Sequence, residues 1–330
     1  MRTGEMGERN FLKSIEHLVV EIEGAKLGFD DDASDIPFTK NRHIVVNVDT
    51  FVGRTDWLPG MTEAQVGRKT AVMALSDIVA KGATPTATML SLCVPEMYDA
   101  IAAQELIRGF SQYCLKSGVP FIGGDVGAAS DVVLTGVAIG IAPPSGIVPR
   151  NGAKVGDIVA VSGLFGLTGS AFEILLHGRK AEEEFRRQAV AAAYKPEIHY
   201  GFVSALAKKK LVTASMDSSD GLAITLHTLA AQSGASILIE DLPVADGVME
   251  FARNLYIHES KMVLEGGEEF ILVLTIPKDC WKGAQEVARK MHIPLRKIGH
   301  VYQGEGVALE TSEGVIELEP RGYDNFREWE

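Results

Sequence analysis

The stretch TEAQVGRKTAVMALSDIVAKGATPTATMLSLCV, residues 62–94, decides the fold class. Its first part, residues 62–82, predicts a long helix, because Thr62 and Gln65 can form a capping box and apolar side chains recur at helical spacing. The short apolar run at residues 86–94 predicts a strand. A helix that leads into a strand indicates a fold that mixes the two kinds of element.

The alternation of helices and strands continues on both sides of this stretch. Helices are expected at residues 11–23, 96–117, from about 169, 180–193 and about 281–291. Strands are expected at residues 43–48, 119–122, 132–141, 157–162, 236–240, 269–276 and near 298–318, with a strand-to-helix step at 216–221. The predicted class is therefore α+β, close to α/β.

The length and the prolines predict two domains. A chain of 330 residues has room for two hydrophobic cores. Pro143, Pro144 and Pro149 lie close together and mark a boundary between them. We therefore expect one domain at residues 1–145 and a second at residues 146–330.

Composition excludes several classes of partner. The formal net charge is −12, from 44 acidic and 32 basic residues, which argues against nucleic acids and anionic membranes. Three distant cysteines predict neither a disulfide framework nor a zinc site and suit a reducing compartment. The first ten residues lack the apolar core of a signal peptide, and no apolar stretch is long enough to span a bilayer. We therefore expect a cytoplasmic protein.

Five short acidic motifs are the strongest chemical signal in the chain: Asp30-Asp31-Asp32, Asp49, Asp77, Asp125 and Asp217-Ser218-Ser219-Asp220. Most of them end an apolar run beside a small residue, where the backbone can approach a ligand closely. Carboxylates that meet in space cannot all be ionised without cations. Oxygen ligands without His or Cys favour magnesium, which binds through a few carboxylates plus substrate phosphates. The sequence therefore predicts a magnesium site where an acidic protein meets an anionic nucleotide.

Each acidic motif also has a purely structural explanation, because aspartate is common at helix N-caps and in turns. Only the meeting of several motifs in the fold separates the two explanations. The familiar phosphate loops are absent. Residues 67–70 resemble the tail of a Walker A loop, but Gly60 lies at the wrong spacing and the segment predicts helix. The spacing of Gly163, Gly166 and Gly169 is not the dinucleotide fingerprint, so a tight turn is favoured there over a phosphate site.

Eight motifs, taken in order, resemble the thiamine-monophosphate kinase family: GFDDDAS (28–34), VNVDTFV (46–52), ALSDIVAKGATP (74–85), FIGGDVG (121–127), PRNGAKVGD (149–157), MDSSDGL (216–222), GGEEF (266–270) and RGYDNF (321–326). The superfamily also contains aminoimidazole ribonucleotide synthetase, selenophosphate synthetase and a hydrogenase maturation factor. The resemblance implies an N-terminal mixed sheet with helices that forms a barrel across a homodimer. It also implies a C-terminal α/β sandwich and an ATP site between the domains.

The resemblance assigns roles to individual residues. It implies magnesium ligands at Asp32, Asn47, Asp49, Asp77, Asp125, Asp217 and Asp220. It implies nucleotide contacts at Gly124, Asp125, Arg150 and Ser219, and substrate contacts at Asp56, Glu268 and Tyr323. The expected catalytic group is Asp77, Asp125, Asp220 and Arg150. The expected reaction is direct in-line transfer of the ATP γ-phosphoryl group to thiamine monophosphate, which gives thiamine diphosphate.

This chain departs from the family pattern at several positions. Asp30 replaces a glycine, Val48 a threonine, Asp56-Trp57 a His-Phe pair, Ala74 an asparagine and Lys81 a methionine. The loss of the histidine leaves the phosphate end of the substrate site open to question. Two alternatives therefore stand beside the kinase. One is an ATP-dependent enzyme of the same superfamily with another acceptor, and the other is a silent homologue that binds nucleotide without turnover.

Overall fold

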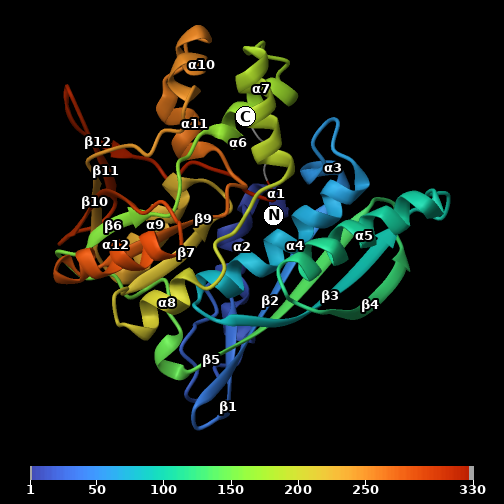
Figure 1. Ribbon diagram of the computed structural model, residues 1–330, viewed down its shortest axis with the longest axis horizontal. Coiled ribbons are helices and arrows are strands. Elements are labelled where there is room, and N and C mark those ends of the chain that lie inside the picture. The colour runs from blue at the N-terminus through green and yellow to red at the C-terminus, as the bar shows by residue number, and fades with distance from the viewer. Residues whose placement is uncertain (1, 327–330) are drawn as a thin grey trace.

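The computed structural model describes residues 2–326, and the strands of its first sheet all precede residue 143. This sheet has the order β1-β2-β5-β3-β4, built from β1 (Ser34–Thr39), β2 (Arg42–Val52), β3 (Thr84–Val94), β4 (Phe121–Ala128) and β5 (Val133–Ala142). Neighbouring strands run antiparallel except β3 and β4, which are parallel. Two long helices, α4 (Glu63–Ala80) and α5 (Ala100–Lys116), cover one face of the sheet (Figure 1).

The two helices that cover the first sheet touch backbone to backbone. A Cβ atom on Gly67 of α4 would lie 1.8 Å from the Leu106 carbonyl oxygen of α5, and one on Gly109 would lie 2.0 Å from the Ala64 carbonyl oxygen. Only glycine permits this approach. The glycine of the segment that resembles a Walker A tail therefore serves helix packing.

The second sheet contains seven strands in the order β12-β11-β8-β10-β6-β9-β7. They are β6 (Ile158–Val161), β7 (Ala214–Ser218), β8 (Ser236–Ile239), β9 (Ile271–Ile276), β10 (Arg296–Tyr302), β11 (Val307–Thr311) and β12 (Gly314–Leu318). Side chains of the central strands alternate between two cores. Ile158 and Ala160 belong to the core with α8 (Phe202–Lys208) and α12 (Trp281–Lys290), whereas Val159 and Val161 belong to the core with α9 (Leu222–Ser233). Helices thus cover both faces of this sheet.

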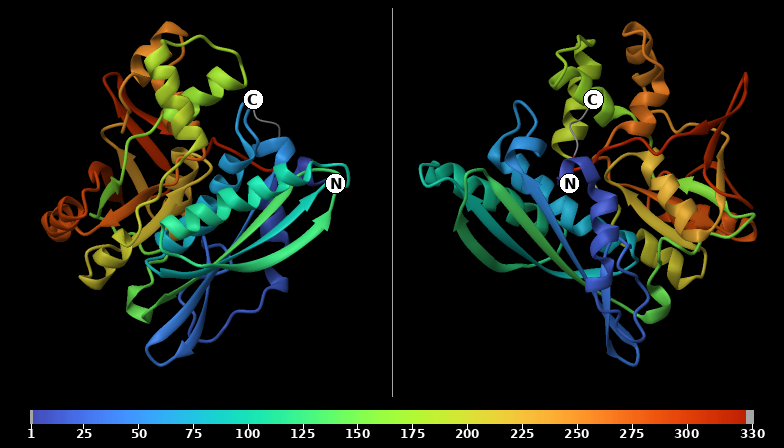
Figure 2. Two further views of the ribbon diagram at one scale, coloured as in Figure 1. Left: turned by 45° about the vertical axis from the view of Figure 1, so that its right-hand side comes forward. Right: turned by 180° about the vertical axis from the view of Figure 1, so that it is seen from behind.

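The remaining helices surround the second sheet and the chain ends. They are α6 (Leu167–Leu175), α7 (Glu183–Tyr194), α10 (Val248–Asn254), α11 (Glu259–Glu265), α1 (Thr3–Met6), α2 (Glu8–Ile15) and α3 (Gly53–Asp56). The first and last described segments lie side by side (Figure 2), where the Glu8 amide donates a hydrogen bond to the Asp324 carboxylate at 3.2 Å. Among the described residues, no helix combines the length and the apolarity needed to cross a bilayer.

The end of α4 joins the two sheets. The Ser76 hydroxyl donates a hydrogen bond to the Asp217 carboxylate on β7. The Lys81 ammonium donates to the Ser215 carbonyl on the same strand at 2.6 Å. Because α4 also packs on the first sheet, this one helix fixes where β7 lies relative to β2.

The α+β class is confirmed, and the helix expected at residues 62–82 is present with its capping box at Thr62. Three of the predicted boundaries are wrong. The helix expected at 11–23 ends by Leu18, and Val20 is 84% exposed, so these apolar side chains have no core to stabilise a longer helix. The domain boundary at residue 145 stays a prediction, and the strands of the two sheets come from either side of it.

The two other wrong boundaries concern strands near the predicted site. The strand expected at residues 43–48 runs on to Val52, so Asp49 lies within β2. The strand expected to end before Gly123 continues through Asp125 to Ala128 as β4. Gly124 is a close-approach residue in the parallel pair, because a Cβ atom there would lie 1.7 Å from the Leu90 carbonyl oxygen of β3.

Candidate active site

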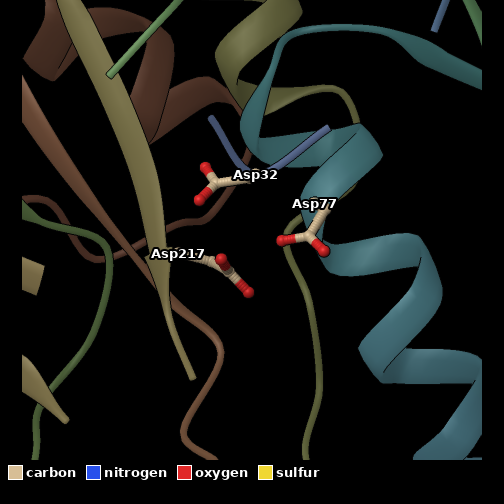
Figure 3. Close-up of side chains that lie close together, drawn as sticks. All are labelled: Asp32, Asp77 and Asp217. Atoms are coloured by element: carbon tan, nitrogen blue, oxygen red, sulfur yellow. The ribbon is translucent and has the colours of Figure 1, made fainter. Parts of the chain in front are cut away.

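Three aspartates from distant parts of the chain meet between the two sheets. Asp32 comes from the loop before β1, Asp77 from α4 and Asp217 from β7, and one carboxylate oxygen of each lies within 4.8 Å of the others (Figure 3). The packing of α4 on β7 brings Asp77 to Asp217. Members of three of the five acidic motifs thus lie together, whereas Asp49 and Asp125 are not part of this group.

Asp49 and Asp220 lie close enough to this group to interact with it electrostatically. The pKa of Asp49 is raised to about 7, mainly by burial and in addition by the charges of Asp217, Asp220 and Asp56, while a hydrogen bond from Thr50 lowers it. Burial, followed by the charges of Asp217 and Asp49, also holds the pKa of Asp77 well above its ordinary value. Burial and the nearby Glu8 raise the pKa of Asp220 to about 6. The raised pKa values of Asp49, Asp77 and Asp220 indicate a local shortage of positive charge.

The donor set of the three-aspartate group fits a hard divalent cation. All three donors are carboxylate oxygens, and no His or Cys belongs to this group in the part of the chain that the structure describes. The buried Asn47, two residues before Asp49 on β2, donates its side-chain N–H to the Ala74 carbonyl at 3.3 Å. Oxygen-only sites of this kind suit magnesium and do not suit zinc or copper.

Two cations hold the acidic loop at residues 30–32. Lys81 lies 2.7 Å from an Asp31 oxygen and 2.6 Å from an Asp32 oxygen. Arg150 pairs with the other Asp32 oxygen, and its Nη1 donates to the Asp30 carbonyl at 2.7 Å. Arg150, for which the family resemblance implies nucleotide contacts, thus binds the acidic loop in this structure. The role of Lys81 was not predicted, and its only signal in the sequence was the departure from methionine.

A second cluster contains the three residues expected to contact the substrate. The Tyr323 hydroxyl donates to Asp56 at 3.4 Å, and the charge of Glu268 raises the pKa of the same tyrosine after burial and Asp56. Lys69 of α4, fully buried, forms an ion pair with Glu268 and donates to the Asp56 carbonyl at 3.3 Å. The charges of Asp56 and Asp217 both raise the pKa of Asp49, so the second cluster lies near the three-aspartate group.

Lys69 and Ser76 were not among the predicted site residues. Lys69 could have been found from its place on the apolar side of α4, because a fully buried ammonium needs a carboxylate partner. Ser76 sits beside Asp77 in the ALSD motif and binds Asp217, which no pattern in the sequence indicated.

Not every predicted ligand lies near the three-aspartate group. Ser219 lies beside Asp220 and donates to its carboxylate at 3.3 Å. Gly124 and Asp125 instead lie on the edge strand β4, where they line a separate hollow of about 250 Å³ with Leu90 and Phe121. Asp125 is exposed and is not part of the three-aspartate group. Its expected role as a metal ligand stays a prediction.

Comparison with known proteins places this geometry in a family. The model of the AIR synthase related protein N-terminal domain matches residues 30–142, and the model of the C-terminal domain matches residues 154–312. A thiamine-monophosphate kinase from Nitrosopumilus maritimus is 33% identical over 314 residues, which cover 94% of this chain and 98% of that relative. The chain belongs to the thiamine-monophosphate kinase family.

Other relatives of the same family agree. A thiamine-monophosphate kinase from Pyrococcus abyssi is 30% identical over 298 residues, and the match covers 90% of each chain. A solved structure, AaThiL complexed with AMPPCP and TMP, is 25% identical with a TM-score of 0.83 and covers 98% of this chain and 99% of that one. The Escherichia coli hydrogenase maturation protein HypE shares the fold at a TM-score of 0.69 and 18% identity.

Proposed function

We propose that this chain phosphorylates thiamine monophosphate with ATP and magnesium to give thiamine diphosphate and ADP. The observation that carries the proposal is the meeting of Asp32, Asp77 and Asp217 between the two sheets. The family membership and the likeness to a relative complexed with AMPPCP and TMP support ATP as the phosphoryl donor and thiamine monophosphate as the acceptor.

In this mechanism, the aspartates bind cations that neutralise the transferred phosphoryl group. Asp32, Asp77 and Asp217 would hold these ions, and the charges of Asp49 and Asp220 would strengthen their binding. Arg150 would exchange its bond to Asp32 for phosphate oxygens, because its fork of donors suits both kinds of acceptor. The acceptor is already an anionic oxygen, so no side chain has to remove a proton from it. In-line transfer then requires positioning and charge neutralisation only.

The second cluster supports a cationic acceptor. Asp56 and Glu268 carry two negative charges and Lys69 carries one positive charge, so the cluster has a net charge of about −1 when all three are ionised. The phenol ring of Tyr323 lies beside them. A thiazolium ring would balance the charge and pack against the aromatic ring. Asp56, however, stands where the family usually has histidine. This residue favours one alternative to the kinase proposal, namely an enzyme that phosphorylates a different acceptor.

We further propose a homodimer that pairs the open faces of the first sheets. The face opposite α4 and α5 carries exposed apolar side chains on three strands, among them Val48 on β2, Met89 on β3 and Ile122 on β4. Such a patch on a sheet is typical of a protein interface. The barrel implied by the family resemblance would bury it.

A coupled ATP-consumption assay tests the kinase proposal. We expect turnover that needs both magnesium and thiamine monophosphate, and Asp77→Asn should nearly abolish it while the circular dichroism spectrum stays unchanged. Turnover only with another acceptor would indicate the altered enzyme. Thermal stabilisation by nucleotide without any turnover would indicate a silent homologue.

A further inference from the structure

The ammonium of Lys81 is fully enclosed at the candidate site. Lys81 is the C-cap residue of α4, and its side chain is 0% exposed. Its nitrogen lies 2.7 Å from Asp31, 2.6 Å from Asp32 and 2.6 Å from the Ser215 carbonyl oxygen. Two of the three N–H donors of this ammonium make hydrogen bonds, to Asp31 and to the Ser215 carbonyl, and the contact with Asp32 is an ion pair. A buried cation with these three oxygen contacts is held in place.

Lys81 acts directly on the three-aspartate group. Asp32 belongs to that group and is also the closest carboxylate partner of Lys81. The charge of Lys81 also lowers the pKa of Asp77, against the larger effects of burial and of neighbouring carboxylates. The field of this ammonium therefore reaches the space that the three carboxylates enclose (Figure 3).

Lys81 and Arg150 differ in how easily each could leave Asp32. Both oxygens of Asp32 are engaged, one by Lys81 and the other by Arg150. The side chain of Arg150 is 13% exposed, whereas Lys81 is enclosed and is also tied to Ser215 on β7. When a metal ion approaches Asp32, Arg150 is therefore the partner that can exchange, and Lys81 stays.

We propose that Lys81 is a resident cation of the acidic cluster. Its ammonium permanently supplies one of the positive charges that the cluster needs, and it holds the loop of Asp31 and Asp32 in place before any metal binds. The inference rests on the proposed function in one respect, namely that divalent ions bind at Asp32, Asp77 and Asp217. It assigns a positioning residue at a place where the family usually has an uncharged methionine.

Two consequences follow for Lys81→Met, which keeps the length of the side chain and removes its charge. A positive charge beside a divalent ion repels it, so the variant should bind Mg²⁺ about tenfold or more tightly, or bind one additional ion. Without metal, Asp31 and Asp32 lose one of their two cationic partners, so the loop should open. If the role of Lys81 were purely structural, Lys81→Met would lower the stability of the fold without any gain in magnesium affinity.

Calorimetric titration with MgCl₂ and hydrogen exchange in EDTA test these consequences on the full chain. In EDTA, the amide of Arg150, which donates to Asp31 at 3.1 Å, should be protected in the wild type and exchange faster in Lys81→Met. Magnesium should restore this protection. The matched control is Lys297→Met on β10, which removes the same charge from the exposed Glu240 pair and should change neither readout.

A second variant, Asp31→Asn, tests the same contact independently in case Lys81→Met does not fold. It removes one anchor of the ammonium, so the loop should again lose protection in EDTA. Equal magnesium affinity of the wild type and Lys81→Met, with unchanged loop exchange in both variants, would overturn the inference alone. If no folded form binds magnesium, the metal site of the proposed function fails and the inference fails with it.

Discussion

Replacing Asp49 by asparagine should make the metal-free protein more stable, although the residue lies in the proposed site. Asp49 has a pKa of about 7 in the folded chain against 3.8 for the free side chain, mainly because it is buried beside other carboxylates. Each pKa unit corresponds to about 1.4 kcal/mol, so the ionised carboxylate destabilises the folded chain by up to about 4 kcal/mol above pH 7. Asparagine is polar and stays buried, so we expect a net gain of about 1–2 kcal/mol.

The sign of the pH dependence follows from the raised pKa. Below the unfolded pKa of 3.8, both states bind the proton and Asp49 contributes no penalty. Between 3.8 and about 7, the unfolded state releases the proton and the folded state keeps it, so the penalty grows with pH. Above about 7 the penalty is constant. The advantage of Asp49→Asn over the wild type should therefore increase from pH 4 to pH 7 and then level off.

Urea unfolding in EDTA and in magnesium with AMPPCP measures both parts of this prediction. In EDTA at pH 8 the variant should unfold at higher urea than the wild type. With magnesium and nucleotide the order should reverse, because the wild type gains binding energy that the variant lacks. A variant that is less stable than the wild type in EDTA would refute the reasoning that carboxylate repulsion is present in the metal-free site.

Three further predictions concern single side chains. Asp77→Asn should lower kcat by about a hundredfold or more while the fold persists, since it removes a ligand of the cation that would neutralise the transferring group, and steady-state kinetics measure the loss. Lys69→Met should lower the free energy of unfolding by about 3 kcal/mol, because Glu268 stays buried without its partner; unchanged urea midpoints would contradict this. Asp56→His removes one of the two negative charges that would balance the thiazolium ring and should raise KM for thiamine monophosphate while KM for ATP stays the same. A change in KM for ATP alone would place Asp56 outside the acceptor site.

Local signals in the sequence were sufficient for most of the secondary structure. The capping box at Thr62 and the apolar spacing behind it predicted α4 to within two residues. Segments whose apolar residues find no packing partner were predicted less well. Leu18 and Val20 continue a helical pattern but are exposed, so the helix stops. Periodicity predicts a helix face, and only the fold shows whether another surface covers it.

The candidate site could be predicted in its residue types but not in its contacts. Acidic motifs at the ends of apolar runs indicated which carboxylates can approach a ligand. The meeting of Asp77 with Asp217 depends on how α4 packs against β7, and these elements are far apart in the chain. The Gly-Gly-Asp sequence before Val126 appeared to end a strand, whereas the parallel pairing of β3 and β4 requires glycine within it. Asp125 was therefore grouped with the other acidic motifs, although it lies on β4 outside the three-aspartate group.

The buried lysines of α4 show a different limit. Lys69 and Lys81 lie on a helix that is otherwise covered, and each is acceptable only because carboxylates from other parts of the chain reach it. No pattern within the helix reveals those partners. The net charge of −12 does show that such cations are scarce in this chain. Their burial beside aspartates therefore identifies the region where charge balance matters most.

The central claim is that Asp32, Asp77 and Asp217 together hold divalent cations at the phosphates of a nucleotide. Crystals soaked with Mn²⁺ and AMPPCP test it most directly, because manganese occupies magnesium sites and can be located by anomalous scattering. We predict anomalous peaks that contact all three carboxylates and the nucleotide phosphates. Peaks elsewhere, or bound AMPPCP whose phosphates lie apart from these aspartates, would contradict the claim.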